Sequence, residues 1–326
     1  MPNIEINNNI TYVCDEGDTV LRSALRRSIP LDYECNSGGC GLCKVKLIEG
    51  ELIRKEGEFS GLSGRDIRKG NYLACQSIPT TDIKIEKDIN SNPKEIIPPE
   101  RCSASIFGVV DISEDVAEFI FSIDRPASYK AGQYYMLDIP GVGERAYSVS
   151  SIQSDENKIS FIIKKKPGGL VSEHLFDRKL NLRDIVLDGP YGNSYYKESD
   201  KGLVLIAGGA GLSPIVSILK YIQGKDVSSI DFFYGVRSSE EINLSYLSNI
   251  TSGIENFNFI PAVSEADEKW SGERGFIHDV VQKHITDYLG KEYYFCGPPL
   301  MTSAVQKLLM LEKSVPFDQL HFDRFF

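Results

Sequence analysis

The sequence predicts a multidomain chain of mixed α+β and α/β class. We expect a small α+β domain at residues 1–92, an antiparallel β-barrel at 101–198 and a parallel-sheet α/β domain at 201–326. A length of 326 residues suits two or three domains. Ser91–Glu100 contains three prolines, which is typical of an exposed linker. Short alternating strands without helices follow this linker, whereas strands alternate with helices after Lys201.

The first domain is predicted to pack several strands around one helix. ITYVCD, KVKLIEGELI and DIKIEKDI read as strands. DTVLRSALRRS has apolar residues at helical spacing from Val20 to Leu25, with Asp18 as the expected N-cap. These elements make a compact α+β unit.

Four cysteines in this domain have the spacing of an iron–sulfur site. CNSGGCGLC places three of them on one glycine-rich loop, and LACQ supplies the fourth after 31 further residues. The glycines allow the loop to curl tightly. A structural zinc site is the alternative, although zinc sites usually combine two close pairs of ligands. The segment resembles the β-grasp fold of plant-type 2Fe-2S ferredoxins, and the resemblance implies that a 2Fe-2S cluster is held by Cys35, Cys40, Cys43 and Cys75.

The barrel domain contains a motif suited to a flavin. Arg145, Tyr147 and Ser148 form the pattern R-x-Y-S, in which an arginine can neutralise a pyrophosphate, a tyrosine offers an aromatic face and a serine can bond a ring nitrogen. An exposed strand of common residues is the alternative. However, Gly169-Leu170-Val171-Ser172 follows at the predicted start of a helix, where free N–H groups favour a phosphate.

These motifs resemble the FAD-binding β-barrel of the ferredoxin-NADP reductase superfamily. The resemblance implies that Arg145 binds the FAD pyrophosphate, that Tyr147 packs against the isoalloxazine and that Ser148 approaches its N5 atom. It also implies a second pyrophosphate contact from the helix start, at Gly169, Val171 and Ser172.

The α/β domain contains two turns that resemble the nucleotide-binding elements of the same superfamily. The first follows the strand LVLIAGG and resembles GG-x-G-x-x-P, with Gly208, Gly209, Gly211 and Pro214. The second, Cys296-Gly297-Pro298, resembles C-G-P-x-x-M at a strand end, where ligands bind in parallel sheets. The resemblance implies that Cys296 lies beside the nicotinamide, which makes Ser148 and Cys296 the expected catalytic residues. Each element alone has a structural alternative, namely a packing turn and a buried apolar thiol.

Together the three segments resemble the reductase component of bacterial multicomponent oxygenases, and most of all the reductases of toluene and related aromatic monooxygenases. The resemblance covers essentially the whole chain. It implies that NADH reduces FAD by hydride transfer and that single electrons pass through the 2Fe-2S cluster to a partner oxygenase, of the diiron aromatic or hydrocarbon monooxygenase type, or to a small ferredoxin. The residues leave NADH and NADPH open, since Arg237 could meet the 2′-phosphate of NADPH and Glu240 and Glu241 would oppose it. The resemblance implies NADH, which most members of the family use. By resemblance, Phe325 or Phe326 covers the flavin.

Composition limits the other possibilities. A net charge of -10 argues against nucleic acid as a partner. The longest apolar stretch, Leu203–Leu219, contains glycines and a proline and is not expected to span a membrane. The start of the chain does not resemble a targeting segment, and an odd count of seven cysteines suits a reducing compartment, so a cytoplasmic location is expected.

Two other functions remain open from the sequence. Reductases that serve nucleotide-deoxysugar dehydratases, of the CDP-4-keto-6-deoxyglucose type, share this domain order. A non-catalytic module could instead hold zinc on the four cysteines and bind nucleotide as a regulatory ligand.

Overall fold

The computed structural model describes residues 1–57, 59–88, 96–154, 156–177 and 184–325. Contacts divide the chain into two compact units. The first comprises Met1–Arg101 and the short segment Asp188–Tyr191, and the second comprises Cys102–Leu187 and Gly192–Phe325. Half of the predicted linker, residues 91–95, lies outside the described residues.

The first unit is an α+β fold built on a mixed sheet with the strand order β2-β1-β7-β3-β5. Strands β1 and β7 pair in parallel, whereas β1–β2, β3–β5 and β3–β7 are antiparallel. A second small sheet joins β4 to β6. The elements are β1 (Asn3–Ile6), β2 (Ile10–Val13), α1 (Val20–Arg26), β3 (Lys44–Glu49), β4 (Leu52–Arg54), α2 (Gly64–Arg68), β5 (Asn71–Leu73), η1 (Ala74–Gln76), β6 (Ser77–Pro79) and β7 (Ile83–Glu86).

Helix α1 buries the predicted apolar face, but its N-cap is Thr19 and not Asp18. The Thr19 side chain accepts a hydrogen bond from the N–H of Arg22 at 3.2 Å. The Asp18 carboxylate instead accepts from Arg26 Nε at 2.8 Å. Because the Asp18 carboxylate pairs with Arg26, Thr19 caps the helix, one residue later than predicted.

The second unit begins with the predicted antiparallel barrel, whose strand order is β11-β10-β13-β8-β9-β12. A bridge between Val149 and Phe161 joins the end of β11 to β12 and closes the sheet on itself. Phe119, Phe121 and Phe161 are fully buried inside it. The elements are β8 (Glu100–Asp111), β9 (Val116–Ile123), β10 (Tyr134–Ile139), β11 (Gly143–Ser148), β12 (Lys158–Lys164), α3 (Leu170–Phe176) and β13 (Ile185–Tyr191).

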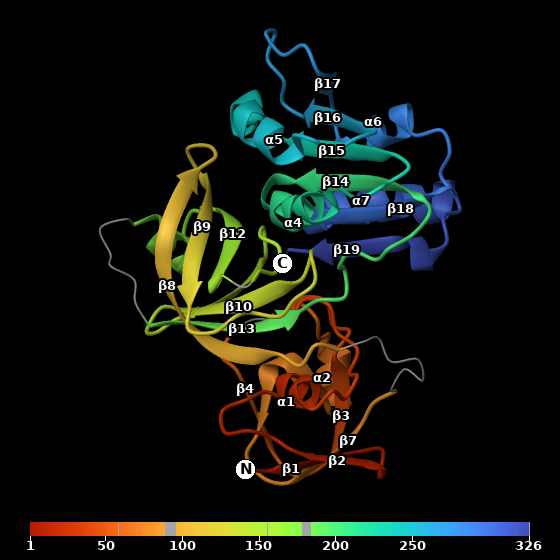
Figure 1. Cartoon of the computed structure of the whole chain (residues 1–326). Helices are drawn as coiled ribbons and strands as arrows, with labels where there is room; N and C mark the ends of the chain where they lie inside the picture. Colours follow the sequence, from red (N-terminus) through yellow and green to blue (C-terminus); the bar gives the residue numbers. More distant parts are fainter. Residues whose placement is uncertain (58, 89–95, 155, 178–183, 326) are drawn as a thin grey trace. The chain divides into compact units, whose positions relative to one another are not determined.

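The remainder of the second unit is the predicted parallel α/β fold, with the strand order β17-β16-β15-β14-β18-β19. Neighbouring strands pair in parallel. Alternate residues of β14 enter different cores, since Leu205 packs with α4 and α5 and Val204 packs with α6 and α7. Figure 1 shows α4 in front of this sheet and α7 behind it. The elements are β14 (Gly202–Gly208), η2 (Gly209–Gly211), α4 (Leu212–Ile222), β15 (Ile230–Val236), η3 (Ser239–Glu241), α5 (Leu244–Thr251), β16 (Phe257–Val263), β17 (Glu273–Arg274), α6 (Ile277–His284), β18 (Lys291–Gly297), α7 (Pro299–Lys307), η4 (Leu308–Glu312), η5 (Phe317–Gln319) and β19 (Leu320–Arg324).

The strand order reverses between β14 and β18, because the chain builds outward from β14 in one direction before returning to its other side. The turns after these two strands therefore meet at the carboxyl edge of the sheet, where α/β proteins bind ligands. Across the described parts of the chain, no helix is long and apolar enough to cross a membrane.

Candidate functional site

The four predicted cluster ligands of the first unit form two pairs. The Sγ atoms of Cys35 and Cys40 lie 3.4 Å apart, and those of Cys43 and Cys75 lie 3.3 Å apart. Two thiolates bound about 2.3 Å from one tetrahedral metal would lie about 3.8 Å apart. Each pair is thus placed to bind one metal atom, and two pairs suit a two-iron cluster.

Hydrogen bonds hold the three-cysteine loop against the segment of the fourth cysteine. The N–H of Ala74 donates to the carbonyl of Cys43 at 3.0 Å, immediately before Cys75. Gln76 Nε2 donates to the carbonyl of Asn36 at 3.1 Å and lies 3.6 Å from the Cys75 Sγ atom. Gln76, directly after the fourth cysteine, is therefore bonded to Asn36, directly after the first.

The glycines let the loop approach a neighbouring segment closely. Gly41 has a φ of +75°, and a Cβ atom there would lie 2.6 Å from the carbonyl oxygen of Gly61. The Gly61 N–H donates to the carbonyl of Gly38 at 3.0 Å. A larger residue at position 41 would push the two segments apart.

The chemistry of this loop fits a sulfur-ligated cluster. The contact between the two thiols lowers the pKa of Cys35 and raises that of Cys40, so the pair shares one proton that a bound metal would displace. The Asn36 side chain is 1% exposed, and neither of its amide atoms has a hydrogen-bond partner among the described residues. A bound group that can accept a hydrogen bond would relieve this cost.

The paired arrangement differs from the single tetrahedral shell of a structural zinc site. Within residues 1–57, 59–88, 96–154, 156–177 and 184–325, no group of three or more His, Cys, Asp or Glu side chains is placed to hold one metal ion. The cysteines are brought together two by two, as a two-iron centre requires.

In the second unit, β11 carries the R-x-Y-S motif and α3 lies against it. Arg145 is exposed, and its Nη1 atom donates to the carbonyl of Glu144 at 2.7 Å. Tyr147 packs against the barrel core, and burial raises the pKa of its hydroxyl. Ser148 ends the strand and is 5% exposed. Arginine and the adjacent first turn of α3 supply the positive charge and the N–H donors that an FAD pyrophosphate needs.

The predicted second flavin element is helix α3, with Gly169 as its N-cap. The Ser172 hydroxyl donates to the carbonyl of Gly169 at 3.2 Å and accepts from the N–H of Lys166 at 3.1 Å, so it shapes the turn that begins the helix. Val171 is 1% exposed and directs its side chain into the barrel core. We expect any ligand contact of Val171 to come from its backbone.

The two turns of the α/β sheet approach each other closely enough to require glycine. A Cβ atom on Gly211 would lie 1.9 Å from the carbonyl oxygen of Cys296. A Cβ atom on Gly297 would lie 2.9 Å from the carbonyl oxygen of Gly208, and one on Gly208 would lie 2.2 Å from Met301 Sδ. The turns predicted to bind a dinucleotide are therefore packed backbone to backbone.

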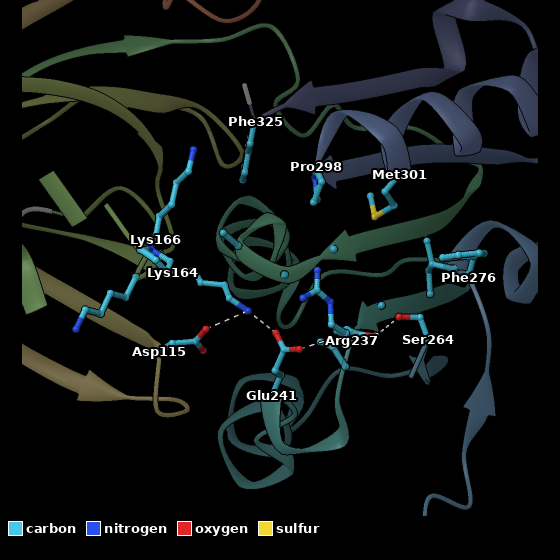
Figure 2. A pocket seen from close by; sticks show the side chains of 18 of the residues that line it. Asp115, Lys164, Lys166, Arg237, Glu241, Ser264, Phe276, Pro298, Met301 and Phe325 are labelled. Atoms are coloured by element: carbon cyan, nitrogen blue, oxygen red, sulfur yellow. Dashed lines mark hydrogen bonds and ion pairs between the residues drawn. The ribbon is translucent and has the colours of Figure 1, made fainter. Parts of the chain in front are cut away.

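A cavity of about 690 Å³ opens above these turns (Figure 2). Its size lies within the usual range for small-molecule and cofactor sites. Among the residues expected from the sequence, Gly208, Gly209, Arg237, Pro298 and Phe325 line it. Gly211, Pro214, Cys296 and Gly297 are not among its lining residues. Cys296 is 1% exposed near the end of β18, and Pro214 lies in the first turn of α4. The predicted Phe326 lies outside the described residues.

Several residues that line this cavity were not anticipated from the sequence. Lys164 lies at the end of β12 in the barrel. Its Nζ atom lies 3.2 Å from Asp115 Oδ2 and also forms an ion pair with Glu241 (Figure 2). The lysine run before Pro167 was a usable signal for an anion-binding surface. Lining residues missed by the sequence reasoning also include Lys165, Lys166, Ser264 and Phe276, whereas Met301 belongs to the predicted C-G-P-x-x-M element.

Glu241 has a structural role that its sequence position did not reveal. Its Oε1 atom accepts hydrogen bonds at 3.1 Å from the N–H groups of Arg237 and Ser238. Burial would raise the pKa of Glu241, but Lys164 and these N–H donors outweigh burial and lower it. The Arg237 side chain is also in the lining; it is 76% exposed, and its Nε atom lies 3.5 Å from Glu265 Oε1.

Comparisons with known proteins match the three parts of the chain separately. Residues 4–80 match a 2Fe-2S iron-sulfur cluster binding domain. Residues 104–196 match an oxidoreductase FAD-binding domain, and residues 205–307 match an oxidoreductase NAD-binding domain.

Relatives align over the whole chain. A ferredoxin–NAD(P)(+) reductase of Metapseudomonas resinovorans is 34% identical over 100% of both chains. The ferredoxin–NAD(+) reductase component of the alkene monooxygenase system of Xanthobacter autotrophicus is 32% identical over 99% of this chain and 100% of its own. The reductase component of a Pseudomonas phenol 2-monooxygenase is 34% identical over 91% of this chain and 86% of its own. The solved ferredoxin reductase in carbazole 1,9a-dioxygenase is 31% identical, with a TM-score of 0.91 over 100% of this chain and 98% of that one.

Proposed function

Because this chain belongs to the family of iron–sulfur flavoprotein reductases that serve bacterial oxygenases, we propose that it passes electrons from NADH to an oxygenase component or to its small ferredoxin. The observation that carries the proposal is full-length alignment with such reductases, in a chain whose cysteines pair two by two and whose glycine turns border a cavity. Relatives named as oxygenase components favour an oxygenase partner over a nucleotide-sugar dehydratase.

Cofactor chemistry explains why one chain needs three domains. When bound, FAD accepts a hydride from NADH as an electron pair, and a 2Fe-2S cluster accepts electrons singly. Hydride transfer requires no general acid or base from the protein. The residues of this chain therefore bind and orient the cofactors and exclude water from them.

We assign the following roles as part of the proposal. Cys35, Cys40, Cys43 and Cys75 bind the cluster. Arg145, with the backbone of Gly169, Val171 and Ser172, binds the FAD pyrophosphate. Tyr147 packs against the flavin ring and Ser148 donates towards it, while Cys296 contacts the nicotinamide. The turns at Gly208–Pro214 and Gly297–Pro298 hold the dinucleotide.

The cavity supports a preference for NADH. Glu241 places a carboxylate in the lining, and Arg237, the residue that would bind a 2′-phosphate, lies 3.5 Å from the carboxylate of Glu265. A carboxylate repels a 2′-phosphate and suits a ribose hydroxyl. Turnover of ferricyanide should be faster at low NADH than at low NADPH, and a clear preference for NADPH would contradict this.

The proposed function is tested on the purified holoprotein. NADH should reduce cytochrome c in a reaction that needs both flavin and iron. The visible absorbance of the wild type should bleach when NADH is added, whereas a protein without the colour of flavin and iron would contradict the proposal. Adding the oxygenase component of the native host should then yield NADH-dependent oxidation of the oxygenase's substrate.

We also propose that the three functional segments correspond to residues 1–92, 101–198 and 201–326, and that the protein works in the cytoplasm. The cytoplasm supplies NADH and keeps thiols reduced, which suits the seven cysteines of the chain. Fractionation of the native host, with NADH-dependent cytochrome c reduction followed in each fraction, tests the location.

A further inference from the structure

Helix α4 carries a polar stripe that contacts the barrel within the second unit. Ser213, Ser217 and Lys220 are spaced four and three residues apart and so share one face of the helix. The Ser213 hydroxyl donates to the carbonyl of Ser148 at 2.6 Å, and the Ser217 hydroxyl donates to the carbonyl of Ser151 at 2.6 Å. The helix that begins at the nucleotide turn is thus hydrogen-bonded to the end of the flavin strand.

Ser213 joins two barrel strands at once. Besides donating to Ser148, its hydroxyl accepts a hydrogen bond from the N–H of Ile162 at 2.9 Å. Its side chain is 1% exposed, so water cannot replace these bonds easily. Ser213 also lies directly before Pro214 in the glycine turn motif. One hydroxyl therefore connects the turn assigned to the nucleotide with the residue assigned to the flavin.

About two turns beyond Ser213 on the helix, Lys220 reaches a buried carboxylate on β9. Glu118 is 7% exposed. Its Oε1 atom accepts from Lys220 Nζ at 3.0 Å, from the Ser150 hydroxyl at 2.7 Å and from the Ser160 hydroxyl at 2.9 Å. Its Oε2 atom accepts from the Tyr246 hydroxyl, on α5, at 2.9 Å. The carboxylate is bonded by side chains of the barrel and by side chains of the α/β fold.

The network is suited to fixing an orientation. Replacing a buried charged network by packed apolar groups is often neutral or stabilising, so such a network gives little evidence of a role in stability alone. Directional bonds to the short segment Ser148–Ser151 instead define how α4 lies on β11 and β12. A misplacement of about 1 Å in a reacting pair can slow a reaction on the order of a hundredfold.

We propose that Ser213 and Glu118 are positioning residues, which hold the nucleotide turn of α4 in register with the flavin strand so that NADH and FAD meet at hydride-transfer distance. This inference rests on the proposed function. It assigns the positioning to side chains outside the R-x-Y-S and C-G-P motifs and predicts a defect confined to one half-reaction.

The test separates the two half-reactions of the holoprotein by stopped-flow absorbance. Reduction of the flavin by NADH should be about ten- to a hundredfold slower in Ser213→Ala and Glu118→Gln. Oxidation of dithionite-reduced protein by cytochrome c should be unchanged, since it does not involve NADH. Lys220→Met, at a side chain that is 27% exposed, gives a milder variant if either buried change impairs folding.

Glu156→Gln is the matched control. Glu156 pairs with Lys158 at 3.0 Å, but both lie on the exposed barrel surface. This variant should reduce and reoxidise at wild-type rates. Flavin content, iron content and the melting temperature are measured for every variant.

Slow reduction with wild-type reoxidation and full flavin content supports the inference. Wild-type reduction rates in folded, flavin-loaded Ser213→Ala and Lys220→Met overturn it, and so does an equal loss in both half-reactions together with lost flavin, which is a purely structural effect. If NADH does not reduce even the wild-type flavin, the proposed function itself fails. The two failures are therefore distinguishable.

Discussion

Replacing Gly211 with alanine tests whether the contact between the two nucleotide turns controls the site. The added Cβ atom would lie 1.9 Å from the Cys296 carbonyl oxygen and 2.4 Å from its carbon. Backbone atoms cannot swing aside as a side-chain tip can. To restore an ordinary separation of 3.4 Å, the turns must move apart by about 1.5 Å.

The expected effect follows from this displacement. Gly211 has a φ of -62°, which alanine adopts without strain, so the penalty is steric. Overpacking of this kind typically costs about 1–3 kcal/mol of unfolding free energy. A shift of about 1.5 Å at Cys296 should also slow flavin reduction by NADH on the order of a hundredfold.

Guanidinium unfolding followed by fluorescence measures the stability, because the one tryptophan of the sequence, Trp270, lies in the α/β fold. The control is Gly108→Ala, where the new Cβ atom would meet Ile120 at an ordinary 3.9 Å. If Gly211→Ala unfolds at the same denaturant concentration as this control and is reduced by NADH at the wild-type rate, the reasoning about the turns is wrong.

Cys43→Ser should remove the visible and EPR signals of the cluster and abolish NADH-dependent reduction of cytochrome c, while ferricyanide turnover by the flavin persists; retention of the cluster spectrum would contradict the ligand assignment. Glu118 gives a pH prediction. Burial would raise the pKa of this carboxyl, but Lys220 and the serine hydroxyls outweigh burial and lower it. The stability that the ionised carboxylate provides is therefore fully present above the unfolded pKa of about 4.3 and is lost as the pH falls through the lower folded value. Urea unfolding of wild type and Glu118→Gln should differ at pH 7 and converge in stronger acid; a gap that widens in acid would refute the sign. Removing Phe325 and Phe326 should change the KM for NADH, because Phe325 lines the cavity, and unchanged KM and flavin absorbance would show that neither ring covers the site.

Local sequence patterns predicted the elements that carry the cofactors. Cysteine spacing in CNSGGCGLC and LACQ defines a loop and a distant fourth ligand, and the folded chain joins them two by two. The glycine turn after LVLIAGG and the CGP turn are each read from about seven consecutive residues. Such patterns can be predicted from sequence because turn conformation and strand periodicity depend on residues that are neighbours in the chain.

Contacts between distant segments were not predictable in this way. Glu118 and Lys220 are 102 positions apart, and Ser213 and Ser148 are 65 apart. Nothing in the local sequence around Glu118 indicates a buried carboxylate, since VAEFIFSID reads as an ordinary strand with one charged residue. The N-cap of α1 is Thr19 and not the predicted Asp18, because the Asp18 carboxylate bonds to the Arg26 side chain instead of to a backbone N–H of the first turn.

The sequence by itself therefore determined which kinds of cofactor the chain takes and indicated the turns that we propose hold them. Only the tertiary structure decided which glycines are required by the contact between the two turns, that barrel lysines line the nucleotide cavity, and that Ser213 and Glu118 connect the flavin strand to the nucleotide helix. The physical reason is that turn and strand preferences are set within a few residues, whereas packing and hydrogen-bond partners depend on which surfaces meet after the chain has folded.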